Sequence, residues 1–273
     1  MGEHMSEQHI LGEKKGAVFH IALNRSEKRN AISFEMLVEL SQMIEGLIYD
    51  PEVRVVIIRG EGLVFSAGVD FNSLGMLATR FMGDEAAGGA PIRADIHKYQ
   101  QYLNRLESIE IPIICAIHGR VYGMGVEFSL ACDIRLMSDD CLWGMQELKF
   151  GVIPDLGGTV RLAKIIGQSR AMEVLMTGKM FDAKTALDWG LVNHVYPKES
   201  LFDEAEKLAS DIIKMSPIPV GAVKKIVKRS EGVDLMTALD MEANLQSQIL
   251  RSEDFTEGVK ALVERRDPNW KRR

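Results

Sequence analysis

Short apolar runs rich in β-branched residues alternate with amphipathic stretches along the N-terminal part of the chain. Each run is too short for a core helix and is followed by polar residues or glycine, so the runs predict buried strands. The predicted strands are Val18–Leu23, Val53–Ile58, Ile111–Ile117 and Ile134–Met137. Strands that are separated by helices pair in parallel through crossovers, which indicates an α/β core.

The first amphipathic stretch predicts a helix that has Ser33 as its N-cap and ends near Tyr49. Its apolar residues recur at helical spacing on one face, at Met36, Leu37, Leu40, Met43, Ile44 and Leu47. After about residue 160 the pattern is almost entirely helical, apart from the short run Val192–Tyr196. The helices predicted there are Asp203–Met215, Gly221–Ser230, Leu235–Leu250 and Asp254–Arg265. We therefore expect a core over residues 10–200 and a helical C-terminal region over residues 201–273.

Charge and cysteine content narrow the range of partners and compartments. The chain has 273 residues and a formal net charge of −6, which disfavours nucleic acid as a partner. No apolar run reaches the ~20 residues that span a bilayer, so we expect no membrane segment. The three cysteines (Cys115, Cys132 and Cys141) show no CxxC spacing, which favours reduced thiols and a cytoplasmic location.

Two glycine-containing turns follow predicted strands and can bring backbone close to a ligand. The first is Phe65–Phe71, where small residues precede an apolar and acidic step. The second is His118–Glu127, which leads from a strand into a helix and exposes N–H groups suited to negative charge. Its spacing matches neither common phosphate-binding motif, so both a phosphate and an oxyanion that develops on a carbonyl remain candidate ligands.

Three carboxylates accompany these turns. Glu147 and Asp155 bracket an irregular turn that contains Pro154 and the pair Gly157-Gly158, and a helix to about Ile166 follows it. Glu127 lies between apolar neighbours in the preceding helix. Carboxyl groups among apolar residues titrate upward, which suits general acid–base catalysis. A helix dipole or an ion pair is the commoner explanation for any one of them alone, and it is the group of three beside two glycine turns that favours catalysis.

Together these segments resemble the crotonase superfamily, the enoyl-CoA hydratase/isomerase family. The matching segments are Leu23–Arg25, Lys28–Ala31, Phe65–Asp70, Gly119–Glu127, Ala131–Ile134, Gly144–Thr159, Arg161-Leu162 and Ala186–Val192. The resemblance implies a spiral of ββα units with a helical C-terminal trimerisation region. It further implies a homotrimer or a hexamer (a dimer of trimers) that acts on acyl-CoA thioesters without a metal or a redox cofactor, coenzyme A being part of the substrate.

The resemblance also assigns roles to single residues. The backbone N–H groups of Val69 and Met124 correspond to the oxyanion hole that holds the thioester oxygen. Met124 stands where many relatives have glycine, so its side chain narrows the neighbouring pocket. The residues that correspond to the coenzyme A site are Lys28, Arg29, Ala31, Ala67 and Asp70, together with Arg265, which reaches the phosphates from the same or a neighbouring subunit.

Three functions remain open. Glu127 and Glu147 match the two glutamates of the hydratases, in which one activates water for attack at C3 and the other protonates C2, a syn addition. Asp155 stands where dienoyl-CoA isomerases have an aspartate that shuttles a proton together with the residue matching Glu147. A non-catalytic acyl-CoA-binding member is the third reading. We expect the acyl group to be lined by residues 71–91 and by the C-terminal helices, and residues 83–91 to form a mobile loop.

Overall fold

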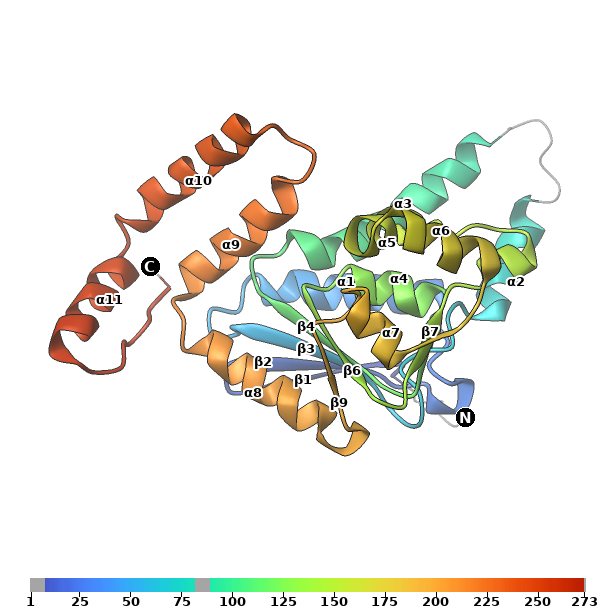
Figure 1. Cartoon of the computed structure of the whole chain (residues 1–273), viewed down its shortest axis with the longest axis horizontal. Coiled ribbons are helices and arrows are strands. Elements are labelled where there is room, and N and C mark those ends of the chain that lie inside the picture. Colours follow the sequence, from blue (N-terminus) through green and yellow to red (C-terminus); the bar gives the residue numbers. More distant parts are fainter. Residues whose placement is uncertain (1–7, 82–88, 273) are drawn as a thin grey trace, which may run out of the picture.

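The computed structural model describes residues 8–81 and 89–272, which form an α/β core with a helical C-terminal part (Figure 1). The strands are β1 (Ile10–Lys15), β2 (Val18–Leu23), β3 (Val55–Gly60), β4 (Ile113–Ile117), β5 (Arg120–Tyr122), β6 (Ile134–Ser138), β7 (Leu142–Gly144), β8 (Phe181–Asp182) and β9 (His194–Tyr196). Six of them form one sheet in the order β1-β2-β3-β4-β6-β9, and β5, β7 and β8 form a small second sheet. All pairs from β2 to β9 in the large sheet are parallel, as predicted.

The helices are α1 (Phe34–Leu47), α2 (Phe71–Phe81), α3 (Ala90–Ser108), α4 (Met124–Leu130), α5 (Gly158–Ile166), α6 (Gln168–Thr177), α7 (Ala183–Asp188), α8 (Leu201–Ile213), α9 (Pro217–Arg229), α10 (Leu235–Ile249) and α11 (Glu253–Glu264). Short 3-10 turns lie at Ser26–Lys28, Glu147–Phe150 and Lys198–Ser200. Of the helices among the described residues, none is both long and apolar enough to cross a membrane. The successive units β4-β5-α4 and β6-β7-α5 have the ββα order that the resemblance implies.

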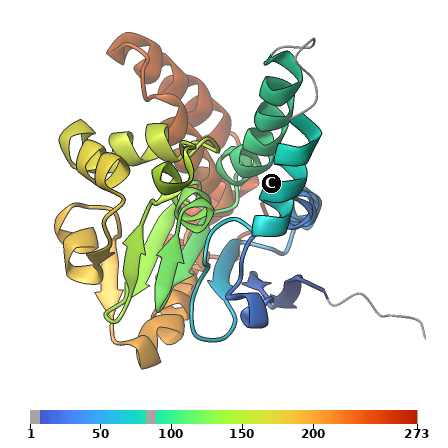
Figure 2. The ribbon, with the colours of Figure 1, turned by 90° about the vertical axis from the view of Figure 1, so that its right-hand side faces the viewer.

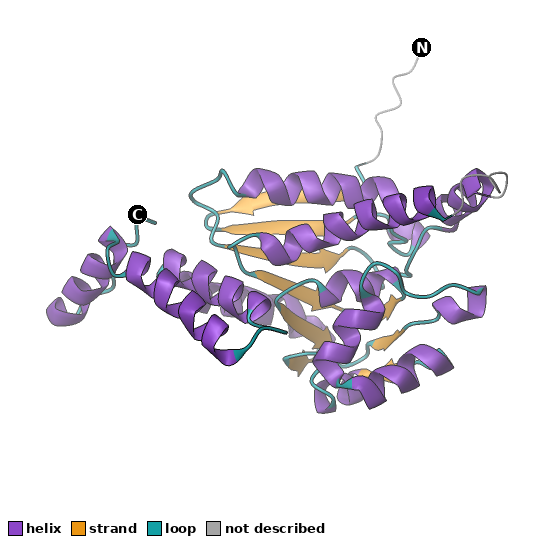
Figure 3. Ribbon diagram, turned by 90° about the horizontal axis from the view of Figure 1, so that it is seen from above, coloured by secondary structure: helices purple, strands orange, loops and turns teal. Residues whose placement is uncertain are grey.

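Alternating side chains of the large sheet point to opposite faces and belong to two apolar clusters. Val56 and Ile58 of β3 pack on the side of α1 and α4, whereas Val55 and Ile57 face α8. Leu201, Ala205 and Ala209 of α8 are buried against that second face. Helix α8, although it lies within residues 201–273, is therefore packed on the core sheet, and the part that stands away from the sheet is α9–α11 (Figures 1 and 3).

Several predicted boundaries are shifted. Helix α1 begins after Ser33, whose Oγ accepts the N–H of Met36 as a cap, and it ends at Leu47. Strand β4 begins at Ile113 rather than at Ile111, because Pro112 has no N–H to donate. Strand β3 runs from Val55 to Gly60 in register with the whole of β2.

The expected loop over residues 83–91 is wrong at its end. Ala90 and Pro91 form the first turn of α3, where the fixed φ of proline and its missing N–H are tolerated. The rest of this expectation, from residue 83 to residue 88, lies outside the described residues. The sequence patterns also gave no sign of β1, α2 or α3 as separate elements, although α2 and the N-terminal half of α3 lie side by side at one end of the core (Figure 2).

Candidate active site

A cavity of about 420 Å³ lies between α2, α3, the start of α4 and the segment that follows β7. It brings together six of the residues singled out from the sequence: Ala67, Val69, Met124, Glu127, Glu147 and Asp155. The other lining residues are mostly apolar or aromatic, and they include Phe34, Phe71, Leu74, Ile92, Ile96, Tyr99, Phe150 and Ile153. An apolar cavity with a few convergent polar groups is the usual form of a small-molecule site.

The amides of Val69 and Met124 reach the cavity from two neighbouring segments. Val69 forms a bridge with Ile32, in which the flanking carbonyl of Gly68 and N–H of Asp70 are bonded at 2.8 Å each. The N–H of Val69 therefore points to the other side, and neither it nor the N–H of Met124 has a hydrogen-bond partner among the described residues. Two unpaired amides in one cavity can accept an oxygen that gains negative charge.

Glycines let these two segments approach each other. Gly68 has φ +94°, and a Cβ there would lie 3.1 Å from the carbonyl oxygen of Tyr122. A Cβ on Gly125 would lie 2.7 Å from the Cβ of Ser66. Ser66 is bridged to Val121 in turn, so the turn before α2 and the start of α4 are fixed against one another.

Glu127 projects from α4 and is almost completely buried, with 2% of its surface exposed. Its Oε1 accepts the N–H groups of Leu156 and Gly158, both at 2.9 Å. Gly158 is required at this point, because a Cβ would lie 2.8 Å from the same oxygen. Burial, together with the charges of Glu147 and Asp155, raises the pKa of Glu127 to about 8 against the lowering effect of these N–H groups.

Glu147 and Asp155 line the same cavity, and little offsets the cost of burying their carboxylate charges. Neither carboxylate oxygen of Glu147 has a hydrogen-bond partner among the described residues, and Gly123 gives it room, since a Cβ there would lie 2.7 Å from Oε1. Burial raises the pKa of Glu147, and the charge of Asp155 adds to the effect. Burial also raises the pKa of Asp155, whose carbonyl oxygen accepts Nε2 of Gln100 at 2.7 Å.

The segment expected to hold coenzyme A borders the cavity without lining it. Lys28 and Arg29 are exposed at the 3-10 turn Ser26–Lys28, and Arg29 has φ +53°. The N–H of Ala67 donates to the carbonyl of Arg29 at 2.9 Å, which joins this turn to the cavity wall. Ala31 contributes its carbonyl to Arg25 Nη1 at 2.9 Å.

Asp70 is occupied by contacts within the protein. Its Oδ2 pairs with Arg25 Nη1 at 3.0 Å, while Oδ1 accepts the N–H groups of Asn72 and Ser73 at the start of α2. Although burial raises the pKa of this carboxyl, these hydrogen bonds bring it below the usual range. The N–H groups of Ala67 and Asp70 are both already bonded within the protein, so neither is free to donate to a ligand.

The C-terminal region does not reach the cavity within one chain. Arg265 is exposed at the end of α11, and α11 and α2 lie at opposite ends of the molecule (Figure 1). The described lining residues all fall between positions 34 and 156, so the expectation that the C-terminal helices line the acyl site is wrong for the single chain.

Helix α3 supplies residues that sequence reasoning missed. Tyr99 stacks on Phe34 with ring centroids 4.1 Å apart, and both line the cavity together with Asp95. The signal was the spacing of Ile92, Ile96 and Tyr99, which places them on one helical face. No Lys or Arg is among the lining residues in the described parts of the chain. Those parts also contain no group of three or more His, Cys, Asp or Glu that could hold a metal ion.

Comparison with known proteins gives one consistent result. Residues 13–273 match the family described as enoyl-CoA hydratase/isomerase. The chain is 34% identical to the peroxisomal Delta(3,5)-Delta(2,4)-dienoyl-CoA isomerase of Arabidopsis thaliana, over 93% of this chain and 92% of that protein. It is 35% identical to a probable enoyl-CoA hydratase of Bacillus subtilis, over 89% and 91%. The crystal structure of an enoyl-CoA hydratase from Bacillus anthracis superposes with a TM-score of 0.88 at 32% identity and covers 97% of this chain and 100% of that one.

Proposed function

The chain belongs to the enoyl-CoA hydratase/isomerase family, and we propose that it is an enoyl-CoA hydratase that adds water across the 2,3 double bond of an acyl-CoA thioester. The observation that supports this most directly is the pair Glu127 and Glu147, which lines the same cavity as the two residues with unpaired amides, Val69 and Met124. In this proposal the coenzyme A moiety belongs to the substrate, and no metal or redox cofactor takes part.

The proposed reaction uses the amides of Val69 and Met124 to hold the thioester oxygen. Glu127 accepts a proton from water as the water oxygen bonds to C3, and the electron pair of the double bond moves toward the thioester. The resulting enolate then takes a proton from Glu147 at C2. An oxyanion-hole donor of this kind contributes about 3–4 kcal/mol to lowering the barrier in enzymes where one has been removed.

The raised pKa values suit this division of labour. Hydration needs one ionised and one protonated carboxyl, and mutual repulsion between neighbouring carboxylates favours such a state. With a pKa of about 8, Glu127 is mostly protonated at neutral pH, and its minor ionised form, which the proposed step uses, is a stronger base than an ordinary glutamate. In the reverse reaction the same two groups exchange the roles of acid and base.

The proposal is tested by replacing each glutamate with glutamine and following the hydration of crotonyl-CoA. We expect Glu127→Gln and Glu147→Gln each to lower kcat by about 10²–10⁴-fold, because general acid–base catalysis is lost while the cavity keeps its shape. Glu39→Gln, on the exposed face of α1, is the matched control and retains full activity. Unchanged turnover in both cavity variants would instead support a non-catalytic acyl-CoA-binding protein.

A second candidate reaction rests on Asp155. This carboxyl lines the same cavity with a raised pKa, and relatives at 34% identity carry the name dienoyl-CoA isomerase. Proton transfer between Glu147 and Asp155 along a conjugated acyl chain is the corresponding mechanism. Assaying Asp155→Asn with a 3,5-dienoyl-CoA separates the two readings: an isomerase loses double-bond migration but still binds the thioester, and a hydratase loses little crotonyl-CoA hydration.

The remaining proposals concern assembly, coenzyme A and compartment. A homotrimer or hexamer is supported by residues on α9–α11 that are more than half exposed although apolar: Val223, Val227, Leu235, Met236, Leu262 and Val263. Such an assembly allows Arg265 of one subunit to join Lys28 and Arg29 of another at the coenzyme A phosphates. Sedimentation analysis tests the assembly.

The three cysteines are free and buried, which fits a reducing compartment such as the cytoplasm, and relatives carry peroxisomal and mitochondrial names as well.

A further inference from the structure

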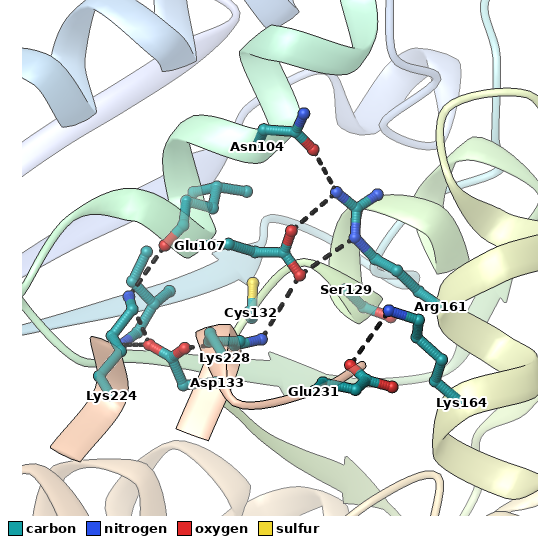
Figure 4. Close-up of polar contacts among 12 residues, drawn as sticks. Asn104, Glu107, Ser129, Cys132, Asp133, Arg161, Lys164, Lys224, Lys228 and Glu231 are labelled. Carbon is teal, nitrogen blue, oxygen red and sulfur yellow. Dashed lines mark hydrogen bonds and ion pairs between the residues drawn. The ribbon is translucent and has the colours of Figure 1, made fainter. Parts of the chain in front are cut away.

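A cluster of ion pairs lies behind the turn that holds Glu127, on the side away from the cavity. We call Glu107, Asp133, Arg161, Lys224 and Lys228 the ion-pair cluster. Its members come from α3, the start of β6, α5 and α9, and Figure 4 shows their side chains converging. None of them lines the cavity that contains the candidate catalytic residues.

The guanidinium group of Arg161 is bonded on every nitrogen. Nε and Nη2 donate to the two oxygens of Glu107 at 3.1 and 2.9 Å, and Nη2 also donates to Oδ1 of Asn104 at 2.5 Å (Figure 4). Nη1 donates to the backbone carbonyl of Leu156 at 2.8 Å. Gly157 leaves room for the group, because a Cβ there would lie 2.0 Å from Nη1.

The turn Leu156–Gly158 is therefore held by hydrogen bonds on both sides. Arg161 binds the carbonyl of Leu156, while the N–H groups of Leu156 and Gly158 point the other way, to Oε1 of Glu127. A shift of the Leu156 peptide plane changes both contacts at once. Two further contacts fix the turn: Gln100 Nε2 donates to the carbonyl of Asp155 at 2.7 Å, and the side chain of Leu156 is buried in the apolar core.

Arg161 is itself anchored through Glu107. Burial raises the pKa of this carboxyl, but the hydrogen bonds and charge of Arg161 and the charge of Lys228 bring it below its usual range, so Glu107 stays ionised. Lys228 Nζ lies 3.5 Å from Oε1 of Glu107 and 3.8 Å from Asp133, whose other oxygen pairs with buried Lys224 at 2.6 Å. The anchor therefore reaches from α3 to α9.

We propose that Arg161 is a positioning residue, which, held by Glu107, fixes the turn Leu156–Gly158 so that both of its N–H groups hold Glu127 in place for proton transfer. The effect on turnover rests on the proposed function, whereas the effect on Glu127 itself does not. An arginine is needed, because only a planar group with several donors satisfies a bidentate carboxylate and a carbonyl together.

A purely stabilising ion pair makes a different prediction, and the ionisation of Glu127 distinguishes the two. The N–H groups of Leu156 and Gly158 lower the pKa of this carboxyl, and burial and the charges of Glu147 and Asp155 oppose them. A turn that is no longer held gives weaker N–H contacts, so Glu127 keeps its proton to higher pH. An ion pair that only stabilises the fold leaves this titration unchanged.

The experiment compares Arg161→Lys and Glu107→Gln with the full-length wild-type chain. Lys164→Ala is the matched control, since Lys164 lies one turn further along α5 and, among the described residues, pairs only with Glu231, at 3.1 Å and with both side chains about half exposed. Difference infrared spectroscopy follows the protonated carboxyl of Glu127 against pH, and subtraction of Glu127→Gln identifies its band. Crotonyl-CoA hydration gives kcat and KM for the same proteins.

We expect Arg161→Lys to raise the midpoint of Glu127 by about one pH unit and to lower kcat by about 10–100-fold with KM within about twofold, because misplacement of a reacting group costs rate rather than binding. Glu107→Gln gives the same signs with smaller size, and it serves as the test variant if Arg161→Lys does not fold. Lys164→Ala matches the wild type.

The outcomes separate the two proposals. A wild-type chain that does not hydrate crotonyl-CoA defeats the proposed function, and the role of Arg161 is then decided by the infrared midpoint alone. An unshifted midpoint in the folded variant overturns the inference whatever happens to the rate. A shifted midpoint with wild-type kcat in an active enzyme overturns its catalytic part.

Discussion

Glu127 and Glu107 are two carboxyl groups on opposite sides of one turn, and their surroundings drive them in opposite directions. On the cavity side, burial and two neighbouring carboxyls together raise the pKa of Glu127 to about 8. On the other side, Glu107 is largely buried as well, but a bidentate guanidinium and a nearby ammonium bring its pKa below the usual range. Burial alone therefore decides neither outcome; the presence of a matched cation does.

The difference separates groups that stabilise from groups that react. In the ion-pair cluster each charge faces an opposite one, so the groups stay ionised and hold helices together. In the cavity, Glu127, Glu147 and Asp155 face one another with no cation among the described lining residues. Such groups cost stability when they ionise, and for Glu127 the pKa of about 8 brings proton exchange near neutral pH.

The largest expected effect is on the cavity side, where Glu127→Gln removes the buried ionisable carboxyl. A carboxyl whose pKa is raised on folding stabilises the fold while protonated, and this contribution, complete below about pH 4.5, is lost as the pH rises to about 8. Relative to Glu127→Gln, the wild type should lose about 1.4 kcal/mol per pH unit, roughly 4 kcal/mol between pH 5 and 8. Urea unfolding of both proteins across this range measures the difference, and two parallel curves would contradict the raised pKa.

A slightly smaller effect is expected in the ion-pair cluster, where Lys224 is replaced by methionine. Its ammonium is buried and donates to the carbonyls of Leu106 and Ile111 at 2.9 Å each, besides pairing with Asp133. Lys224→Met leaves three acceptors without their donor, and loss of one partner of a buried pair costs about 3 kcal/mol. The figure is at the low end because Asp133 keeps the N–H of Ile113.

The control for this prediction is the next residue along α9. Lys225 pairs with Glu110 at 3.6 Å, with side chains that are 35% and 58% exposed. Lys225→Met should change the free energy of unfolding by no more than about 0.5 kcal/mol. Equal losses in the two variants show that the position of the helix, and not the buried ammonium, determines the effect.

The smallest effect is expected at an exposed ion pair of α5. Lys164→Ala removes the exposed pair with Glu231, and such pairs contribute about 0.5 kcal/mol or less. Added salt should erase even this difference, because exposed charges are screened. Thermal unfolding at low and high ionic strength checks the result, and a salt-independent loss above 1 kcal/mol is the outcome that contradicts it.

Local patterns predicted the helices and strands in which buried apolar residues recur at a regular spacing. The helix from Phe34 to Leu47 and the strand from Val18 to Leu23 are examples, since spacing alone indicates which side chains pack inward. Helix α3 was missed because its polar residues outnumber its apolar ones, and the face with Ile92, Ile96 and Tyr99 becomes visible only against Phe34 and the cavity. Strands β5, β7 and β8 are too short to give a pattern of their own.

The candidate site divides in the same way. By itself the sequence determined which turns contain glycine and which carboxyls stand near them, because close approach of backbone needs residues without a Cβ, as at Gly68 and Gly158. Only the tertiary structure decided which carboxyl meets a cation. Lys224 and Arg161 look in the sequence like the polar face of ordinary amphipathic helices, and their carboxylate partners, Asp133 and Glu107, lie 91 and 54 positions away along the chain. Electrostatic pairing depends on distances across the fold and on burial, and neither is encoded in local spacing.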